Sequence, residues 1–175
     1  MRAVRPNVEF HVYGEVTGAH GDELRALVED LHLSEAVYLN APVKLDEMPQ
    51  IIAEADIGVV PKRADTFGNE AFSTKILEFM SQGVPVVVSK TSVDRYYFKE
   101  DTVRFFTPGD SDSLAEAILD VMNNVSLRQS LIENGLRCAQ ENSWERRKDV
   151  YFDIINKLTD GSPHNEQAPR IQEGH

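Results

Sequence analysis

The chain has 175 residues, 41% of them hydrophobic, so it is long enough to enclose one hydrophobic core. Its formal net charge of −11 repels nucleic acid and anionic lipid, so any phosphate compound must be held by local donors such as backbone N–H groups. No apolar run is long enough to predict a membrane span, the first residues lack the apolar segment of a signal peptide, and the single cysteine, Cys138, excludes an internal disulfide. These features predict a cytoplasmic location, with Cys138 as a packed thiol on a helix face.

Short apolar runs along the chain predict β-strands. They occupy residues 8–14, 36–40, 57–60, 84–89 and 103–106. The run VVVS is apolar almost throughout, as is typical of a strand covered on both faces.

Helical periodicity lies between these runs. It predicts helices over residues 21–33, 45–55 and 72–82, the last ended by Gly83 in the position after a helix C-cap. After residue 106 the pattern is entirely helical, over 111–124, 125–142 and 143–158. Ser111 or Asp112 is expected to cap the first of these three helices, and Ser143 the last.

The alternation of strands and helices predicts an α/β fold, with a parallel sheet of about five strands, helices on both faces and an all-helical C-terminal end. Residues 1–158 are expected to form one domain, followed by a polar, disordered tail over 159–175. Ligands of such sheets bind at the carboxyl ends of the strands, which makes the segments after each strand the place to search.

Two glutamates separated by seven residues stand out in the stretch GNEAFSTKILEFMSQGVPVVVS, residues 68–89. On one continuous helix, Glu70 and Glu78 would lie about 12 Å apart along the axis, although the helix predicted over 72–82 begins after Glu70. This spacing suits an elongated ligand better than a glycosidase pair at ~5–9.5 Å. The start of the helix between them has unpaired N–H groups that favour phosphate. Lys75, in the first turn, opposes the helix dipole unless an anion lies nearby.

A simpler interpretation of the same residues is also open. Asn69 or Ser73 would cap the helix, Glu70 would complement its dipole, and Glu78 would be a solvated surface residue. The spacing alone does not decide between this reading and a ligand site.

The segment EAFSTKILEFMSQGVPVV resembles the signature of the group 1 glycosyltransferases, in which two glutamates separated by seven residues precede a PVV strand. Other segments resemble the family in the same order: VEFHVYGEVTG, AVYLNAPVKLDEMPQIIAEADIGVVP, VRFFTPGDSDSLAEAI and NSWERRKDVY. The resemblance covers residues 6–158. It implies the Rossmann-like, C-terminal donor-binding domain of a retaining enzyme with the GT-B fold.

The resemblance also implies roles for the two carboxylates. Glu70 would contact donor-sugar hydroxyls and stabilise positive charge at the anomeric carbon, and Glu78 would hydrogen-bond the ribose hydroxyls. The backbone N–H groups of the intervening residues would hold the distal phosphate; these residues are Ala71, Phe72, Ser73 and Thr74.

Further donor contacts follow from the same resemblance. The loop that contains Ala41 and Val43 would touch the base, and Gly14 would let the backbone approach the donor. The family's Gly residues after the first glutamate are replaced by Ala71 and Ser73 here, and its Gly-x-Gly loop reads GEVTG.

A larger departure is an absent segment. The family's domain opens with an earlier strand that carries an Arg and a Lys for the diphosphate, and no residues here match it. The chain therefore resembles a fragment that also lacks the acceptor-binding N-terminal half, and Lys62, Arg63 and Lys75 are the nearby cations that could substitute. A sheet without that central strand would close the gap, leave unpaired edges or borrow a strand from a partner.

The remaining candidates are weaker. The histidines are scattered without metal-ligand spacing, which favours structural or surface roles. Asp94, Arg95, Tyr96 and Tyr97 follow a strand end, where a loop packed by the two tyrosines is favoured over a substrate contact.

The resemblance thus implies a hexosyltransferase domain that needs neither a metal ion nor a cofactor. Its donor substrate would be a nucleoside diphosphate sugar. Its acceptor would be a glycan or lipid-linked sugar of a polysaccharide pathway. Its expected partner is the N-terminal acceptor-binding domain or a chain that supplies it, through which it would be peripheral to the membrane. By itself the chain is expected not to turn over. Three alternatives stay open: a non-catalytic nucleotide-sugar binding subunit, a sugar-nucleotide epimerase fragment and a scaffolding domain.

Overall fold

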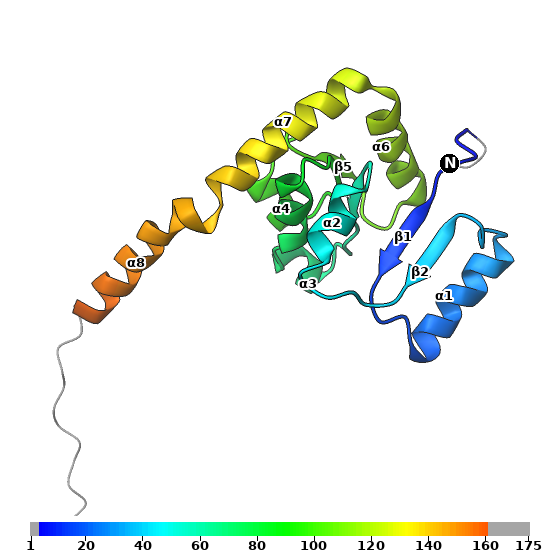
Figure 1. Ribbon diagram of the computed structural model, residues 1–175, viewed down its shortest axis with the longest axis horizontal. Coiled ribbons are helices and arrows are strands. Elements are labelled where there is room, and N and C mark those ends of the chain that lie inside the picture. Colours follow the sequence, from blue (N-terminus) through cyan, green and yellow to red (C-terminus); the bar gives the residue numbers. More distant parts are fainter. Residues whose placement is uncertain (1–3, 161–175) are drawn as a thin grey trace, which may run out of the picture. The chain divides into compact units, whose positions relative to one another are not determined.

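The computed structural model describes residues 4–160, which form two compact units that meet between Ala139 and Gln140. The strands are β1 (Phe10–Tyr13), β2 (Val37–Asn40), β3 (Gly58–Val60), β4 (Val86–Ser89) and β5 (Arg104–Phe106) (Figure 1). The helices are α1 (Gly18–Asp30), α2 (Met48–Ala53), α3 (Thr66–Glu70), α4 (Thr74–Ser81), α5 (Ser92–Tyr97), α6 (Ser111–Asn123), α7 (Val125–Glu141) and α8 (Trp144–Asp160).

The strands are all parallel, as predicted, but they form two sheets instead of one. β1 pairs with β2, so that Phe10 lies opposite Val37, and β3, β4 and β5 form the second sheet in that order. Within the described chain, β1 pairs only with β2 and β3 only with β4, because no described strand lies between them to carry ladder hydrogen bonds. Of the three outcomes considered for a sheet without a central strand, the structure shows unpaired edges.

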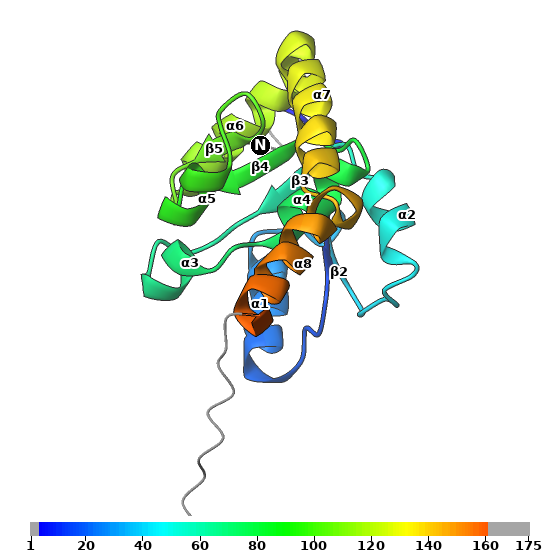
Figure 2. The same cartoon turned by 90° about the vertical axis from the view of Figure 1, so that its left-hand side faces the viewer.

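The core surrounds β4, whose four residues are all buried. Because side chains alternate across a strand, Val86 and Val88 join one hydrophobic cluster and Val87 joins another on the opposite face. The first cluster is completed mainly by Ile76 and Met80 of α4. The second includes residues of α6 and α7. Helices therefore cover both faces of the three-stranded sheet, as predicted (Figure 2).

Close packing joins α4 to α7 within the first unit. A Cβ on Gly135 would lie 3.1 Å from Cγ of Met80, so the absence of a side chain lets the two helices approach. Cys138 is partly buried and packs against the same cluster, which confirms the packed thiol expected from the sequence. Gly83 has a φ of 72° after α4, which confirms its predicted role in ending that helix.

Several helix boundaries differ from the predictions. α1 begins at Gly18, three residues before the predicted start. The cap of α6 is Asp110, not Ser111 or Asp112, because its carboxylate accepts hydrogen bonds from two first-turn N–H groups. α5 forms where a loop was predicted.

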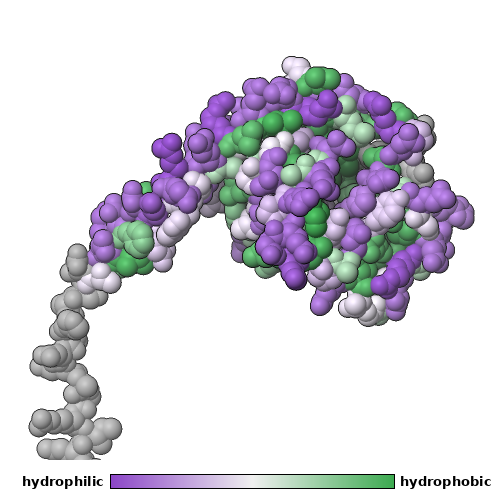
Figure 3. All heavy atoms as spheres, in the orientation of Figure 1, coloured by the Kyte–Doolittle hydropathy of each residue, from purple (hydrophilic) through white to green (hydrophobic). Residues whose placement is uncertain are grey.

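The second unit contains α8, which carries many apolar side chains. Every described side chain of this helix is exposed, and hydrophobic side chains show among hydrophilic ones on its surface (Figure 3). The rings of Trp144, Tyr151 and Phe152 contact one another. The helix continues to Asp160, two residues into the range expected to be disordered. The rest of that predicted tail, 161–175, lies outside the described residues.

Candidate donor-binding site

The two glutamates of the motif lie on different helices. Glu70 is the last residue of α3, a helix that the sequence does not predict, and Glu78 is on α4. α4 begins at Thr74, two residues after the start of the helix predicted over 72–82. α3 is capped by Asp65, whose carboxylate accepts a hydrogen bond from the N–H of Gly68 at 2.7 Å. It ends because Ala71 has an extended ψ of 113°. Both glutamate side chains are exposed, so both are available to a ligand.

The segment between the two helices offers free backbone donors. Phe72 and Ser73 lie outside regular structure, and neither N–H group has a hydrogen-bond partner among residues 4–160. Ser73 is the N-cap residue of α4, but its side chain makes no capping hydrogen bond. Ser73 therefore has the N-cap position of the alternative interpretation without its capping hydrogen bond, and the amide oxygen of Asn69 accepts instead from the N–H of Ser92 on α5.

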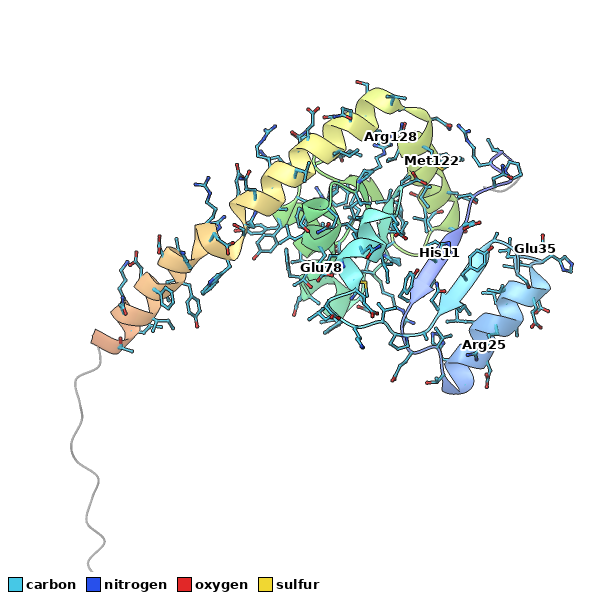
Figure 4. All side chains as sticks on the ribbon, in the orientation of Figure 1. His11, Arg25, Glu35, Glu78, Met122 and Arg128 are labelled. Atoms are coloured by element: carbon cyan, nitrogen blue, oxygen red, sulfur yellow. The ribbon has the colours of Figure 1, made fainter. Side chains whose placement is uncertain are left out.

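The first turn of α4 is electrostatically unusual. It contains no acidic residue, and Lys75 is exposed there without an ion pair to any described residue. A cation at a helix N-terminus is unfavourable by some tenths of a kcal/mol unless an anion binds nearby. One turn further on, Glu78 accepts a hydrogen bond from the hydroxyl of Thr74 at 3.0 Å (Figure 4).

An aromatic cluster lies next to this segment. The ring of Phe72 makes an edge contact with Tyr97 at 5.0 Å between centroids and stacks on Phe98 at 5.9 Å. Tyr96 contacts Tyr97 but is itself largely exposed. The prediction of a loop packed by two tyrosines is thus wrong, because the residues form a helix that presents both rings to the surface.

A buried polar network is hydrogen-bonded to the same segment through the carbonyl oxygen of Ala71. The ammonium group of Lys62 lies 2.7 Å from Oδ2 of Asp94 and donates a hydrogen bond to the carbonyl oxygen of Ala71 at 2.9 Å. The Asp94 side chain is 0% exposed and also accepts from the hydroxyl of Thr91 at 2.7 Å. Its Oδ1 atom has no hydrogen-bond partner in the described structure. Ser89 completes the network by accepting from the N–H of Lys62 at 2.7 Å.

The sequence predicts only part of this network. The sequence marks Lys62 as a cation near the candidate site, but it predicts a loop at Asp94. The signal that could have revealed its position is the spacing of Thr91 and Asp94, which matches the S/T-x-x-D/E pattern of a helix N-terminus. Thr91 is indeed the N-cap of α5, and its hydroxyl accepts from the N–H of Asp94.

The remaining predicted donor contacts lie on the two-stranded sheet. Gly14 follows β1, and its N–H donates to the carbonyl oxygen of Asn40 at 3.3 Å. Ala41 and Val43 follow β2, so all three residues lie at the carboxyl ends of these parallel strands. Within residues 4–160, none of them hydrogen-bonds to the segment that joins α3 and α4.

A pocket of about 340 Å³ opens at the carboxyl ends of the three-stranded sheet, where ligand sites were predicted for this fold class. It is lined by Pro61, Lys62, Arg63, Ala64, Ser89, Phe106, Pro108 and Gly109. Lys62 and Ser89 of the buried network line it, whereas Glu70, Glu78, Phe72 and Ser73 do not.

Three further observations concern His11, metal ligands and membrane-spanning helices. His11 stacks on Tyr38 at 4.7 Å and lies 3.0 Å from Glu9, a surface role as predicted (Figure 4). Among residues 4–160, no three His, Cys, Asp or Glu side chains are grouped so that they could hold a metal ion. No helix in the same range has the length and apolar character needed to cross a membrane.

Known proteins similar to this chain are glycosyltransferases. A D-inositol 3-phosphate glycosyltransferase of Paenarthrobacter aurescens is 24% identical over 164 residues, which are 92% of this chain and 39% of that protein. A phosphatidyl-myo-inositol mannosyltransferase of Mycobacterium leprae is 30% identical over 82 residues, which are 46% of this chain and 22% of that protein. The chain thus spans about two fifths of the length of the first of these relatives.

Solved structures share the fold. Anabaena Alr3699/HepE in complex with UDP-glucose superimposes with a TM-score of 0.73 at 22% identity, over 89% of this chain and 42% of that chain. A sucrose-phosphate synthase from Thermosynechococcus elongatus gives 0.73 at 23% identity, over 83% of this chain and 36% of that chain. These likenesses confirm the Rossmann-like domain of the GT-B fold. The family described as "Glycosyl transferases group 1" matches residues 1–137, and the chain therefore belongs to this glycosyltransferase family.

Proposed function

We propose that the chain forms the donor-binding half of a retaining glycosyltransferase. The reaction moves a hexose from a nucleoside diphosphate sugar to a hydroxyl group of a glycan or lipid-linked acceptor. The observation that carries this proposal is the pair of unpartnered N–H groups of Phe72 and Ser73, which lie between the exposed carboxylates of Glu70 and Glu78. Donors flanked by two acceptor side chains match a diphosphate flanked by two sugars.

Each part of the site has a role in this proposal. The free N–H groups and the start of α4 bind the distal phosphate, and the exposed Lys75 then lies near an anion instead of opposing the dipole alone. Glu78 exchanges its hydrogen bond from Thr74 for the ribose hydroxyls, since a carboxylate can only accept. Glu70 stabilises the positive charge that develops at the anomeric carbon, and the base lies against the loop of Ala41 and Val43.

The comparisons support a nucleotide ligand. Structures of Anabaena Alr3699/HepE contain UDP, UDP with glucose, or UDP-glucose, and that protein shares this fold. Because the chain spans 39% of its first relative, we assign the acceptor side of the reaction to a further segment or a partner chain. The chain alone is then expected to bind the donor without transferring sugar, and to do so equally well in the presence of a metal chelator.

Thermal unfolding with UDP, GDP, ADP and CDP tests the proposal. A ligand at 100 times its dissociation constant adds about 2.7 kcal/mol of stability, so one nucleotide should raise the melting temperature and thereby identify the base. The variant Glu78→Gln should lose most of this shift, because an amide is a weaker acceptor for the ribose. Glu116→Gln, at an exposed position of α6, is the matched control and should keep it. A protein that unfolds at the same temperature with all four nucleotides would contradict the proposal.

A further inference from the structure

Lys62 connects three segments of the first unit through its ammonium group. It lies just beyond β3, its ammonium group pairs with Asp94 of α5, and the same group donates to the carbonyl oxygen of Ala71 between α3 and α4. The side chain is only 13% exposed, so it is a component of the interior and not a solvated surface cation.

Contacts with buried residues hold this ammonium group in place. Ser89, at the end of the central strand β4, holds the backbone N–H of Lys62. Asp94 holds the ammonium group and is itself held by the hydroxyl of Thr91. Because both anchors are completely buried, Lys62 presents its remaining hydrogen-bond capacity to Ala71 from a rigid base.

The bond to Ala71 orients the next N–H group. A peptide unit is planar and trans, so the carbonyl oxygen of Ala71 and the N–H of Phe72 belong to one rigid plane and point in opposite directions. Lys62 draws the oxygen toward the interior, and the N–H of Phe72 therefore points away from Lys62. That N–H group is one of the two that have no partner in the described chain.

We propose that Lys62 is a positioning residue for the donor diphosphate: it fixes the Ala71–Phe72 peptide so that the Phe72 N–H is aimed at the distal phosphate. This inference rests on the proposed function, because it assumes that the free N–H groups bind phosphate. In this proposal the lysine acts through the Ala71–Phe72 peptide. The preorganised donor needs no reorientation when the nucleotide binds, which favours affinity.

The test compares nucleoside diphosphate with nucleoside monophosphate, since only the diphosphate has the distal group. Lys62→Met alone leaves the buried Asp94 charge uncompensated and endangers folding. The double variant Lys62→Met/Asp94→Asn removes both charges together with the donor to the Ala71 carbonyl. The control Arg104→Met/Asp120→Asn removes another ion pair, at 3.0 Å, that has no contact with this peptide.

Isothermal titration of the folded variants with UDP and UMP, or the corresponding pair for the base identified above, gives the readout. The wild type and the control should show the same preference for the diphosphate. The double variant should bind the monophosphate as the wild type does, while its preference for the diphosphate falls about tenfold, equivalent to ~1.4 kcal/mol. A merely structural role would weaken both ligands alike.

The possible outcomes distinguish failure of the positioning role from failure of the proposed function. If the wild type prefers the diphosphate and the folded double variant keeps that preference, the positioning role is overturned and the proposed function stands. If the wild type binds no nucleotide, both the proposed function and the positioning role of Lys62 are overturned.

Discussion

Replacement of Gly68 by alanine should disturb the site through the backbone alone. An ideal Cβ at this position would lie 1.9 Å from the carbonyl oxygen of Arg63, although Gly68 has no positive φ and no strained conformation of its own. Close carbon–oxygen contacts in proteins begin near 3.3 Å, so the two backbone segments must separate by about 1.4 Å. Because the obstacle is backbone, no side-chain rotation can relieve the overlap.

The separation would act on Glu70, two residues further along the same short helix. Gly68 also donates its N–H to the capping carboxylate of Asp65, so the shift opens the first turn of α3. We expect a loss of about 1–3 kcal/mol in the free energy of unfolding, the range for overpacked sites. A shift of this size is enough to break a hydrogen bond of ordinary length, so binding of the sugar part should be weakened as well.

The assay combines urea unfolding with titration of a nucleoside diphosphate sugar and its parent diphosphate. Gly68→Ala should lose stability and also lose the extra affinity that the sugar contributes through Glu70. Gly83→Ala is the control: its φ of 72° penalises alanine by roughly 1–2 kcal/mol, yet its Cβ meets no atom closer than 3.9 Å. The control should therefore lose stability and keep the sugar contribution. A Gly68→Ala protein with wild-type stability and ligand preference would refute the argument.

Three comparisons test the packing, the helix cap and the buried ion pair described above. Ile76→Ala should lower the free energy of unfolding by about 2–5 kcal/mol because the side chain is fully buried, whereas Leu45→Ala, at a side chain that is 89% exposed, should change it by less than about 0.5 kcal/mol in urea titrations. Asp110→Ala should cost about 1 kcal/mol through loss of the α6 cap, and equal stability to the wild type in calorimetry would count against that cap. Lys62→Met should lower the free energy of unfolding by about 3–5 kcal/mol, because it leaves the buried Asp94 without its partner. Adding Asp94→Asn should recover part of this stability. A double variant less stable than the single one would contradict the ion-pair interpretation.

The order and type of most elements could be predicted because they depend on local patterns. The buried strand β4 was predicted from a continuous apolar run, and the end of α4 from Gly83 followed by Pro85. The parallel pairing followed from the alternation of strands with helices. These features are set by interactions between residues close in the sequence, or by how often apolar residues recur.

The candidate site was predicted less completely. The spacing of Glu70 and Glu78 and the family resemblance located the segment, but not the interruption at Ala71 that places the two glutamates on separate helices. Sequence spacing treats a helix as continuous, and here the capping of α3 and the extended residues after it divide the segment. The buried state of Asp94 was missed because it depends on a lysine that lies 32 positions earlier in the chain.

The sequence by itself therefore determined the α/β class, the succession of strands and helices, and which short segment carries the paired carboxylates, since each is encoded by local composition and spacing. The tertiary structure alone decided that the strands form two sheets with unpaired edges, and that Lys62 joins Asp94 to the carbonyl of Ala71. The physical reason is that ladder partners and buried ion pairs form between residues distant in sequence. Only the packed chain brings such groups within hydrogen-bonding distance.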